Sequence, residues 1–249
     1  VDTEDYAVHL MVQSYINKLF ENGSFVQAVV AETNKTDIKT RQKHAMEYDD
    51  EKMNYVLNPK LGIHGTVIDG YQTAARIAGM IGAVPCNQSL THTVIENATE
   101  LLEELTPVQM TKAETMGCLV LSRNTRKQIW IDNAINTMTN PTEDKDKGWK
   151  KIRRVKTRFE FLRRVNTIVD DLVGRVDNDM NGRATVMSQM QGVGDSMIGE
   201  GKLMACTVSE SSGYKADGDS AWFDIDVIDK DSMEHIYLTF LFRFSTNME

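Results

Sequence analysis

The segment Gly148–Val173 reads GWKKIRRVKTRFEFLRRVNTIVDDLV and predicts a long amphipathic helix. Its apolar residues recur every three or four positions, at Trp149, Ile152, Val155, Phe159, Leu162, Val165, Val169 and Leu172. That spacing places them on one stripe of an α-helix, which is buried while the other positions face outward. We therefore expect this helix to pack its apolar stripe against the body of the protein and to present a polar face.

The predicted outward face is strongly basic. Between Lys150 and Arg164 it carries eight Lys or Arg residues and one acid, Glu160, a charge of +7. The whole chain carries −8, so the remaining residues carry −15. A cationic helix on an acidic body indicates an acidic partner surface, although the stems of such residues also cover apolar surface on ordinary solvated helices. Lys150 and Lys151 fall in the predicted first turn, where positive charge opposes the helix dipole.

The composition excludes several classes of function. Of the 249 residues, 41% are hydrophobic and 26% are charged, which is typical of a globular protein. A pI near 5.2 argues against bulk binding to nucleic acid or to an anionic membrane, and no apolar run is long enough for a membrane span. Cys86, Cys118 and Cys206 are widely spaced in apolar surroundings, so we expect reduced core residues of a cytoplasmic protein.

The element pattern predicts an α/β to α+β fold with two domains, each a mixed β-sheet flanked by helices. In residues 1–105 we expect helices at Asp2–Asn22 and Tyr71–Ala83, and strands at Phe25–Ala31 and Met53–Leu57. In residues 106–249 we expect helices at Thr106–Met116, 148–173 and Arg183–Ile198, a hairpin of Cys118–Leu121 with Gln128–Asp132, and strands at Leu203–Val208, Ala221–Ile228 and Glu234–Phe244.

The clearest period-two pattern lies in HIYLTFLFRF, near the end of the sequence. In an extended strand, one side would carry Ile236, Leu238, Phe240, Phe242 and Phe244. Burial of each such side chain is worth roughly 1.5–3 kcal/mol, so this side requires a cover. Either the strand covers the core of its own domain, or it pairs into the sheet of a neighbouring subunit.

Motifs for catalysis are incomplete. The run GEGKL at 199–203 resembles a phosphate loop, but Ser196 replaces its first glycine and Leu203 replaces the Ser or Thr that binds magnesium. The five histidines are dispersed without metal-ligand spacing. We therefore expect no catalytic residues, no metal site and no cofactor, and a protein that is not an enzyme.

One short segment matches the opening of a calcium-binding loop. Asp177, Asp179 and Asn181 precede Gly182, and helices are predicted on both sides. The twelfth loop position is Ser188, where a bidentate Glu is needed. Asp, Asn and Gly are also typical of helix–helix turns, so we interpret the segment as a turn.

Several segments together resemble the C-terminal domain of contractile tail sheath proteins. They are TPVQMTKAETMGCLVLSRN, QIWIDNAINTMT, GWKKIRRVKTRFEFLRRVN, VDNDMNGRATV, GEGKL and GDSAWFDIDVIDKDSMEHIYLTFLFRF, in this order from Thr106 to Phe244. The resemblance is to the sheaths of myophages and of phage-like bacteriocin particles. Residues 1–105 resemble the middle α/β domain of the same proteins, through YDDEKMNYVLN and IDGYQTAARIAGMIGAVPCNQS.

The resemblance implies a structural protein. Subunits of the family assemble as stacked hexameric rings around a tail tube and contract to drive it through a bacterial envelope. The implied partners are other sheath subunits, as a homo-oligomer, and the tail tube protein, with no nucleic acid and no membrane. The implied location is the tail of a virion or phage-like particle, assembled in the bacterial cytoplasm. Val1 falls within a helical pattern, so we expect a fragment that lacks the N-terminal arm of the family.

The resemblance also assigns roles to two sets of residues. A helix of the C-terminal domain faces the tube in the family, so the tube-contact candidates are Lys150, Lys151, Arg153, Arg154, Lys156 and Arg158. Terminal arms add strands to neighbouring subunits, so the inter-subunit strand candidates are Ile236, Leu238, Phe240, Phe242 and Phe244. The same strand can instead belong to the fixed sheet that accepts arms from other subunits.

Two other classes stay open. One is a non-contractile assembly protein of the same particle, and the other is a soluble α/β enzyme with an unrecognised site. Flat charged faces and exposed strand edges favour assembly. A convergent pocket with perturbed carboxylates favours an enzyme.

Overall fold

The computed structural model describes residues 1–143, 145–234 and 236–242. In chain order its elements are α1 (Tyr6–Glu21), β1 (Ala28–Ala31), α2 (Ile38–Tyr48), β2 (Met53–Val56), β3 (Leu61–Ile63), β4 (Thr66–Ile68), α3 (Gly70–Ala83), β5 (Ala98–Leu101), α4 (Pro107–Thr115), β6 (Cys118–Leu119), β7 (Leu121–Arg123), β8 (Ile129–Ile131), the 3-10 helix η1 (Lys147–Lys150), α5 (Ile152–Leu172), α6 (Met180–Gly199), β9 (Leu203–Glu210) and β10 (Phe223–Asp229). Several small sheets flanked by helices confirm the expected mixed α/β to α+β class.

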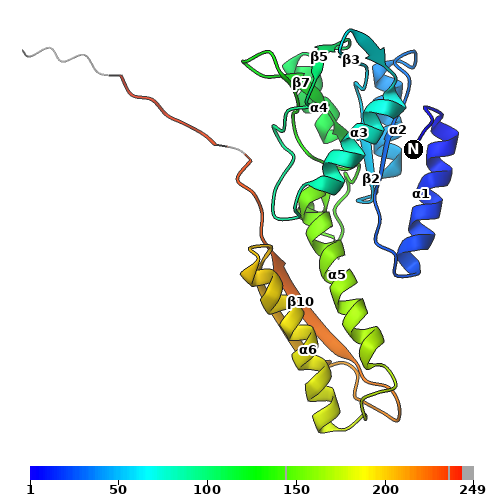
Figure 1. Cartoon of the computed structure of the whole chain (residues 1–249), viewed down its shortest axis with the longest axis vertical. Helices are drawn as coiled ribbons and strands as arrows, with labels where there is room; N and C mark the ends of the chain where they lie inside the picture. Colours follow the sequence, from blue (N-terminus) through cyan, green and yellow to red (C-terminus); the bar gives the residue numbers. More distant parts are fainter. Residues whose placement is uncertain (144, 235, 243–249) are drawn as a thin grey trace, which may run out of the picture.

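The larger of two bodies is built on the parallel sheet β1-β2-β6 (Figure 1). Every residue of β1 and β2 is buried, as is typical of parallel strands covered on both faces. Alternate residues enter different clusters: Val29 and Val56 pack with α3, whereas Val30 and Tyr55 pack with residues of α1, α2 and α4. We call this part the upper body; the antiparallel sheet β4-β3-β5 and the hairpin β7-β8 complete it.

The expected hairpin is confirmed for β7 and β8, which pair antiparallel. The segment before it divides differently from the prediction, because Cys118 and Leu119 form β6 and pair parallel with β2. The buried Asn58 side chain supports this division by bonding both the N–H and the carbonyl of Leu121. The pairing of β2 with β6 joins residues on both sides of position 105. The predicted division into domains of residues 1–105 and 106–249 stays a prediction.

Helix α5 runs from the upper body into a smaller lower body (Figure 1). Its buried apolar residues confirm the amphipathic pattern, and Ile152 joins the upper core while Phe161 and Val165 join the lower one. The prediction that Lys150 and Lys151 lie in the first turn of this helix is wrong. Lys150 ends η1, and Lys151 is the extended N-cap residue that pairs with Ile135 as an isolated bridge, so neither lysine lies in the first turn of α5.

The lower body consists of the second half of α5, α6 and the antiparallel pair β9-β10. Its core includes Val165, Met190 and Cys206, from α5, α6 and β9 respectively. Gly194 permits α6 to approach β9 closely, because a Cβ at this position would collide with the side chain of Cys206. All three cysteines of the chain are free and buried, as predicted.

The expected terminal strand does not form within the described part of the chain. Residues 236–242 have no strand partner there and extend away from both bodies (Figure 1), while Phe244 lies outside the described residues. The interpretation that this segment covers the core of its own domain is therefore wrong for residues 236–242. The β9-β10 sheet ends at Asp229, and the apolar side chains of residues 236–242 are largely exposed and do not pack on a core.

Candidate assembly interface

Two arginines of α5 hold the carboxylate at the end of β10. Arg154 Nε lies 2.8 Å from Asp229 Oδ2, and Arg158 Nε lies 3.2 Å from the same atom. The Asp229 side chain is only 6% exposed, so this pair of ion pairs is largely removed from water. The hydrogen bond to Asp229 raises the pKa of Arg154. The Arg158 guanidinium also lies 4.1 Å from the centre of the Trp149 ring, which fixes it from the other side.

Two further cations hold the residues that follow. Lys151 Nζ lies 2.9 Å from Asp231 Oδ2 and 3.1 Å from Glu234 Oε2, and Arg153 donates to the carbonyl of Lys230. Burial alone would raise the pKa of Asp231, but the hydrogen bonds from Lys151 and from the Ser232 N–H bring the pKa below its ordinary value. The arm root, defined as residues 229–234, is thus clamped to the start of α5.

Glu234 connects the arm root to the upper body as well. Its side chain is 4% exposed, and Ser89 Oγ donates to Glu234 Oε1 at 2.6 Å. Because Lys151 approaches the second carboxylate oxygen, both oxygens of Glu234 have partners. The last residue of the arm root is therefore tied to the start of α5 and to the loop between α3 and β5.

The two remaining basic candidates bond to carbonyl groups. Lys156 donates to the carbonyls of Ile81 and Val84 at the end of α3, where positive charge complements the helix dipole. Lys150 Nζ donates to the carbonyl of Glu114 at 2.6 Å. All six tube-contact candidates thus have partners within the chain, and the expectation that they lie on an outward face is wrong. Their contact with a tube stays a prediction.

The acidic partners of these cations were missed at the sequence level. Asp229, Asp231 and Glu234 lie in the run DIDVIDKDSME at 224–234, which begins within the predicted strand Ala221–Ile228. A signal was present, because this acidic run is complementary in charge to the basic helix. Charge complementarity alone does not show which segments are neighbours, since the paired residues Arg154 and Asp229 are 75 positions apart.

Beyond the arm root, residues 236–242 form what we call the arm. Its one-sided apolar set is highly exposed, with Ile236 at 69%, Leu238 at 70%, Phe240 at 72% and Phe242 at 87%. The Tyr237 and Leu241 side chains on the other side are exposed too, at 92% and 72%. A contiguous apolar surface of this kind marks an interaction site.

The lower body offers an unpaired strand edge on β10. Within the described residues β9 pairs only with β10, in a register that places Ile225 opposite Val208. One face of this two-stranded sheet packs on the lower core through Ile225 and Val208, whereas Asp224 and Asp226 are exposed. On β9 the Gln191 side chain of α6 already donates to the Cys206 carbonyl and accepts from the Val208 N–H, so it is β10 that keeps an outer edge whose N–H and C=O groups can pair with an added strand.

A cluster around Glu160 joins the two bodies beside α5. Lys202, before β9, lies 2.7 Å from Glu160 Oε1, and the Cys86 thiol, after α3, donates to Oε2 at 2.7 Å. Burial alone would raise the pKa of Glu160, but the bonds from Cys86 and Lys202 lower it. Arg164 completes the cluster by pairing with Glu160 and with Glu200. These contacts connect the lower body to the end of α3.

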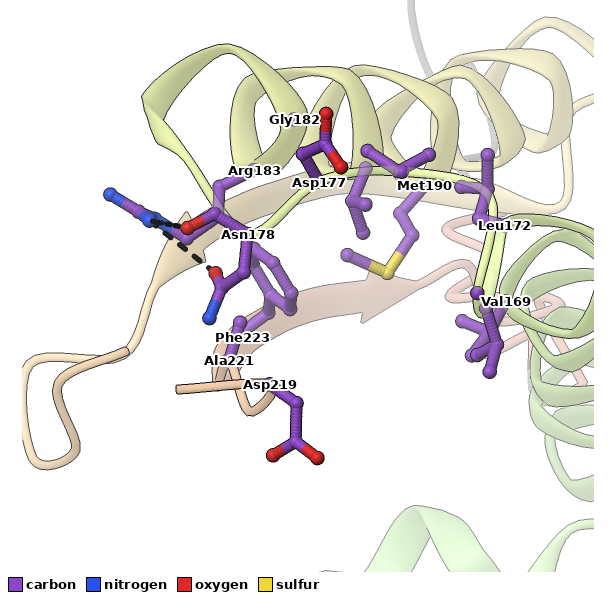
Figure 2. A pocket seen from close by; sticks show the side chains of 14 residues that line it. Val169, Leu172, Asp177, Asn178, Gly182, Arg183, Met190, Asp219, Ala221 and Phe223 are labelled. Atoms are coloured by element: carbon purple, nitrogen blue, oxygen red, sulfur yellow. Dashed lines mark hydrogen bonds between the residues drawn. The ribbon is translucent and has the colours of Figure 1, made fainter. Parts of the chain in front are cut away.

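A hollow of about 290 Å³ lies at the far end of the lower body, between the end of α5, the start of α6 and the start of β10 (Figure 2). The predicted turn borders it: Asp179 is the N-cap of α6 and accepts from the Gly182 N–H at 2.7 Å. At the rim, Arg183 donates to the carbonyl and side-chain oxygen of Asn178. The described residues contain no group of three His, Cys, Asp or Glu side chains placed to hold a metal.

One perturbed carboxyl group bears on the enzyme alternative. Burial raises the pKa of Glu114 to about 7, and the neighbouring carboxylate of Asp132 adds to this effect. Ser122 Oγ donates to Asp132 at 2.7 Å, so the Asp132 side chain is held by the β7-β8 hairpin.

Among the described helices, none is long and apolar enough to cross a membrane.

The family of the chain follows from its first 137 residues. Residues 1–137 match the family model of the phage tail sheath protein central domain. The match covers more than half of the chain, so this chain belongs to the family of phage tail sheath proteins, which are structural proteins of phage-like particle tails. A comparison with curated proteins gave no significant match.

Solved sheath structures share the fold. A sheath tail protein from Desulfitobacterium hafniense matches with a TM-score of 0.71 and 20% identity over 92% of this chain, and one from Listeria innocua with 0.72 and 18% over 92%. The sheath complex of an extracellular contractile injection system, PVC, in its contracted state matches with 0.70 and 13% over 92% of this chain and 68% of that chain. This chain spans 55% of the length of each of the first two proteins.

Proposed function

We propose that this chain is part of a structural subunit of a contractile tail sheath, which assembles as stacked rings around a tail tube. Membership of the tail sheath family supports the proposal, as does the fold shared with the sheath of a contractile injection system. The observation that carries it furthest is the combination, in one chain, of an exposed apolar arm and an unpaired strand edge on β10. Assembly in the bacterial cytoplasm is part of the same proposal.

The arm acts as a donated strand. Its four same-side apolar residues gain roughly 1.5–3 kcal/mol each on burial, and its backbone gains hydrogen bonds at an edge of a neighbouring β9-β10 sheet. A donor and an acceptor in every subunit generate a continuous mesh. Backbone pairing survives rigid-body movement of the subunits, so the mesh stays connected during contraction.

The contacts that clamp the arm root determine where the donated strand is attached to its own subunit. Asp229, Asp231 and Glu234 fix the root to α5 and to Ser89, whereas the donated strand is fixed to the neighbour. The donated strand and the body of its own subunit are therefore each held firmly, one by the neighbour and one by the clamp. Removal of one partner from a buried ion pair is strongly destabilising, so the root stays in place under load.

Tube contact by the six basic residues is a separate proposal. Arg153 is 4% exposed, while the other five are half-buried and retain some accessible surface. Since these cations already have partners within the chain, a tube would meet only the part of each side chain that stays accessible. Ion pairs at such exposed atoms are worth roughly 0–1 kcal/mol each, weak enough to release on contraction. An acidic tube surface would be the required partner.

Electron microscopy of the full-length sheath protein that contains this chain tests the assembly proposal. The wild-type protein, expressed alone, should form striated tubes or stacked rings. A double variant, Ile236→Asp with Phe240→Asp, should fold but not form stacks, and Thr239→Asp on the opposite side of the arm is the matched control. Monodisperse wild-type monomers at high concentration would contradict the proposal.

A further inference from the structure

The hollow of Figure 2 lies beside the unpaired edge of β10. Its walls include Val169 and Leu172 from α5, Met190 from α6 and Phe223 from β10, and its lining among the described residues includes none from β9. Because β9 occupies the other edge of β10, a strand can be added to β10 only on the side away from β9, and Phe223 then lies between that strand and β9. The figure shows Phe223 and Met190 pointing into the space between the two helices and the strand.

The character of the hollow fits an apolar side chain. Its rim carries Asp177, Asn178, Arg183 and Asp219, and Arg183 is already engaged by Asn178 and by Glu210 at 3.1 Å. The walls behind this rim are aliphatic or aromatic. A cavity of about 150 Å³ with such walls is enough to bind benzene in a protein interior. A hollow of about 290 Å³ therefore has room for a phenyl ring and part of a neighbouring side chain.

We propose that this hollow is the acceptor site for a phenyl ring from the arm of a second copy of this chain, supplied by Phe240 or Phe242. The inference rests on the proposed strand donation and adds the position that selects the register. In the arm, two aliphatic residues precede two aromatic ones. The aromatic end is the part whose size matches the hollow.

The orientation of the added strand follows from this match. The residues of β10 that face the lower core are Phe223, Ile225 and Val227, and only Phe223 borders the hollow. An arm that runs antiparallel to β10 places its aliphatic residues near Val227 and its aromatic residues near Phe223. Antiparallel pairing is also the more stable arrangement per residue, and it is the one β10 makes with β9.

The ring comes from a second copy because of the clamp. Glu234 is held by Lys151 and Ser89 near the start of α5, at the opposite end of the lower body from the hollow (Figure 1). The arm leaves this point away from the lower body. In the described part of the chain the arm does not run beside its own β10, so that edge is left for the arm of a neighbouring copy.

Sedimentation equilibrium of the full chain tests the inference. Phe240→Ala together with Phe242→Ala should weaken self-association about 10- to 100-fold, because a phenyl contact of roughly 1.5–3 kcal/mol is lost. Val186→Phe, which fills the hollow from α6, should weaken it by a similar factor. Combining both changes should add little to either alone, since they remove the same contact. Tyr237→Ala, on the other side of the arm, should have little effect.

The outcomes distinguish the phenyl site from the strand donation on which it rests. Ala221→Phe fills the hollow from the opposite wall, and thermal unfolding of both filled variants verifies that they fold. If association requires residues 236–242 but neither filled hollow weakens it, strand donation stands and the phenyl site is refuted. If Ile236→Asp with Phe240→Asp leaves association unchanged, strand donation and the phenyl site are both refuted.

Discussion

Arg154 and Asp229 form a bidentate ion pair that joins the start of α5 to the end of β10. Arg154 Nε lies 2.8 Å from Asp229 Oδ2, and Nη2 lies 2.5 Å from Oδ1. Paired, parallel hydrogen bonds of this kind are the strongest arginine–carboxylate contacts. Through this ion pair, a basic helix that the sequence suggests is solvent-facing instead anchors the arm root.

Asp229→Asn should destabilise the chain. The change leaves the guanidinium groups of Arg154 and Arg158 without their shared carboxylate in a largely buried place, at a cost of about 3 kcal/mol. Urea unfolding measures the difference. Asp226→Asn, at an exposed position of the same strand, is the control and should change the unfolding free energy by less than about 0.5 kcal/mol. Equal effects of the two changes would argue against the clamp.

A charge swap should distinguish the clamp from a tube contact. Arg154→Asp alone should unfold more easily and assemble poorly, and the combination with Asp229→Arg should recover much of the stability because the ion pair is restored in reverse. If Arg154 acts only through the clamp, the double variant should also assemble on tubes. A stable double variant that forms rings but does not retain tubes in electron micrographs would instead support direct tube contact.

The apolar side of the arm should matter for assembly and not for folding. Ile236 and Phe240 are 69% and 72% exposed, so replacing both with Asp should shift the thermal unfolding midpoint by no more than a degree or two. Association should be lost, because carboxylates cannot enter an apolar interface unpaired. A large loss of thermal stability in the isolated chain would show that the arm packs on its own subunit.

Glu114→Gln should change how stability depends on pH. The pKa of Glu114 is raised in the folded chain from 4.5 to about 7, so the folded state binds a proton that the unfolded state has released between these values. The wild type should therefore lose stability relative to the variant as pH rises from about 4.5 to about 7, with a constant difference above that. Urea unfolding at several pH values measures this, and Glu143→Gln, at an exposed position, is the control. Parallel curves for wild type and variant would contradict it.

Local patterns in the sequence predicted most of the elements. The Thr106-Pro107 start of α4 is confirmed by a capping box between Thr106 and Gln109, which depends only on residues three positions apart. The apolar spacing of α5 and the turn at Asp179 were equally local. The start of β1 at Ala28 and the separation of β6 (Cys118–Leu119) from the β7-β8 hairpin could not be predicted from local patterns. Strand ends depend on which neighbouring strand supplies the hydrogen bonds.

The sequence by itself determined the period of α5, the alternation of the arm and the membership of the sheath family. Each depends on which residue types follow one another along the chain. Only the tertiary structure decided that the basic residues of α5 hold Asp229, Asp231 and Glu234, and that the arm is left uncovered. The physical reason is range: periodicity arises from backbone geometry over a few residues, whereas ion pairing across 75 positions depends on where packing brings two distant segments together.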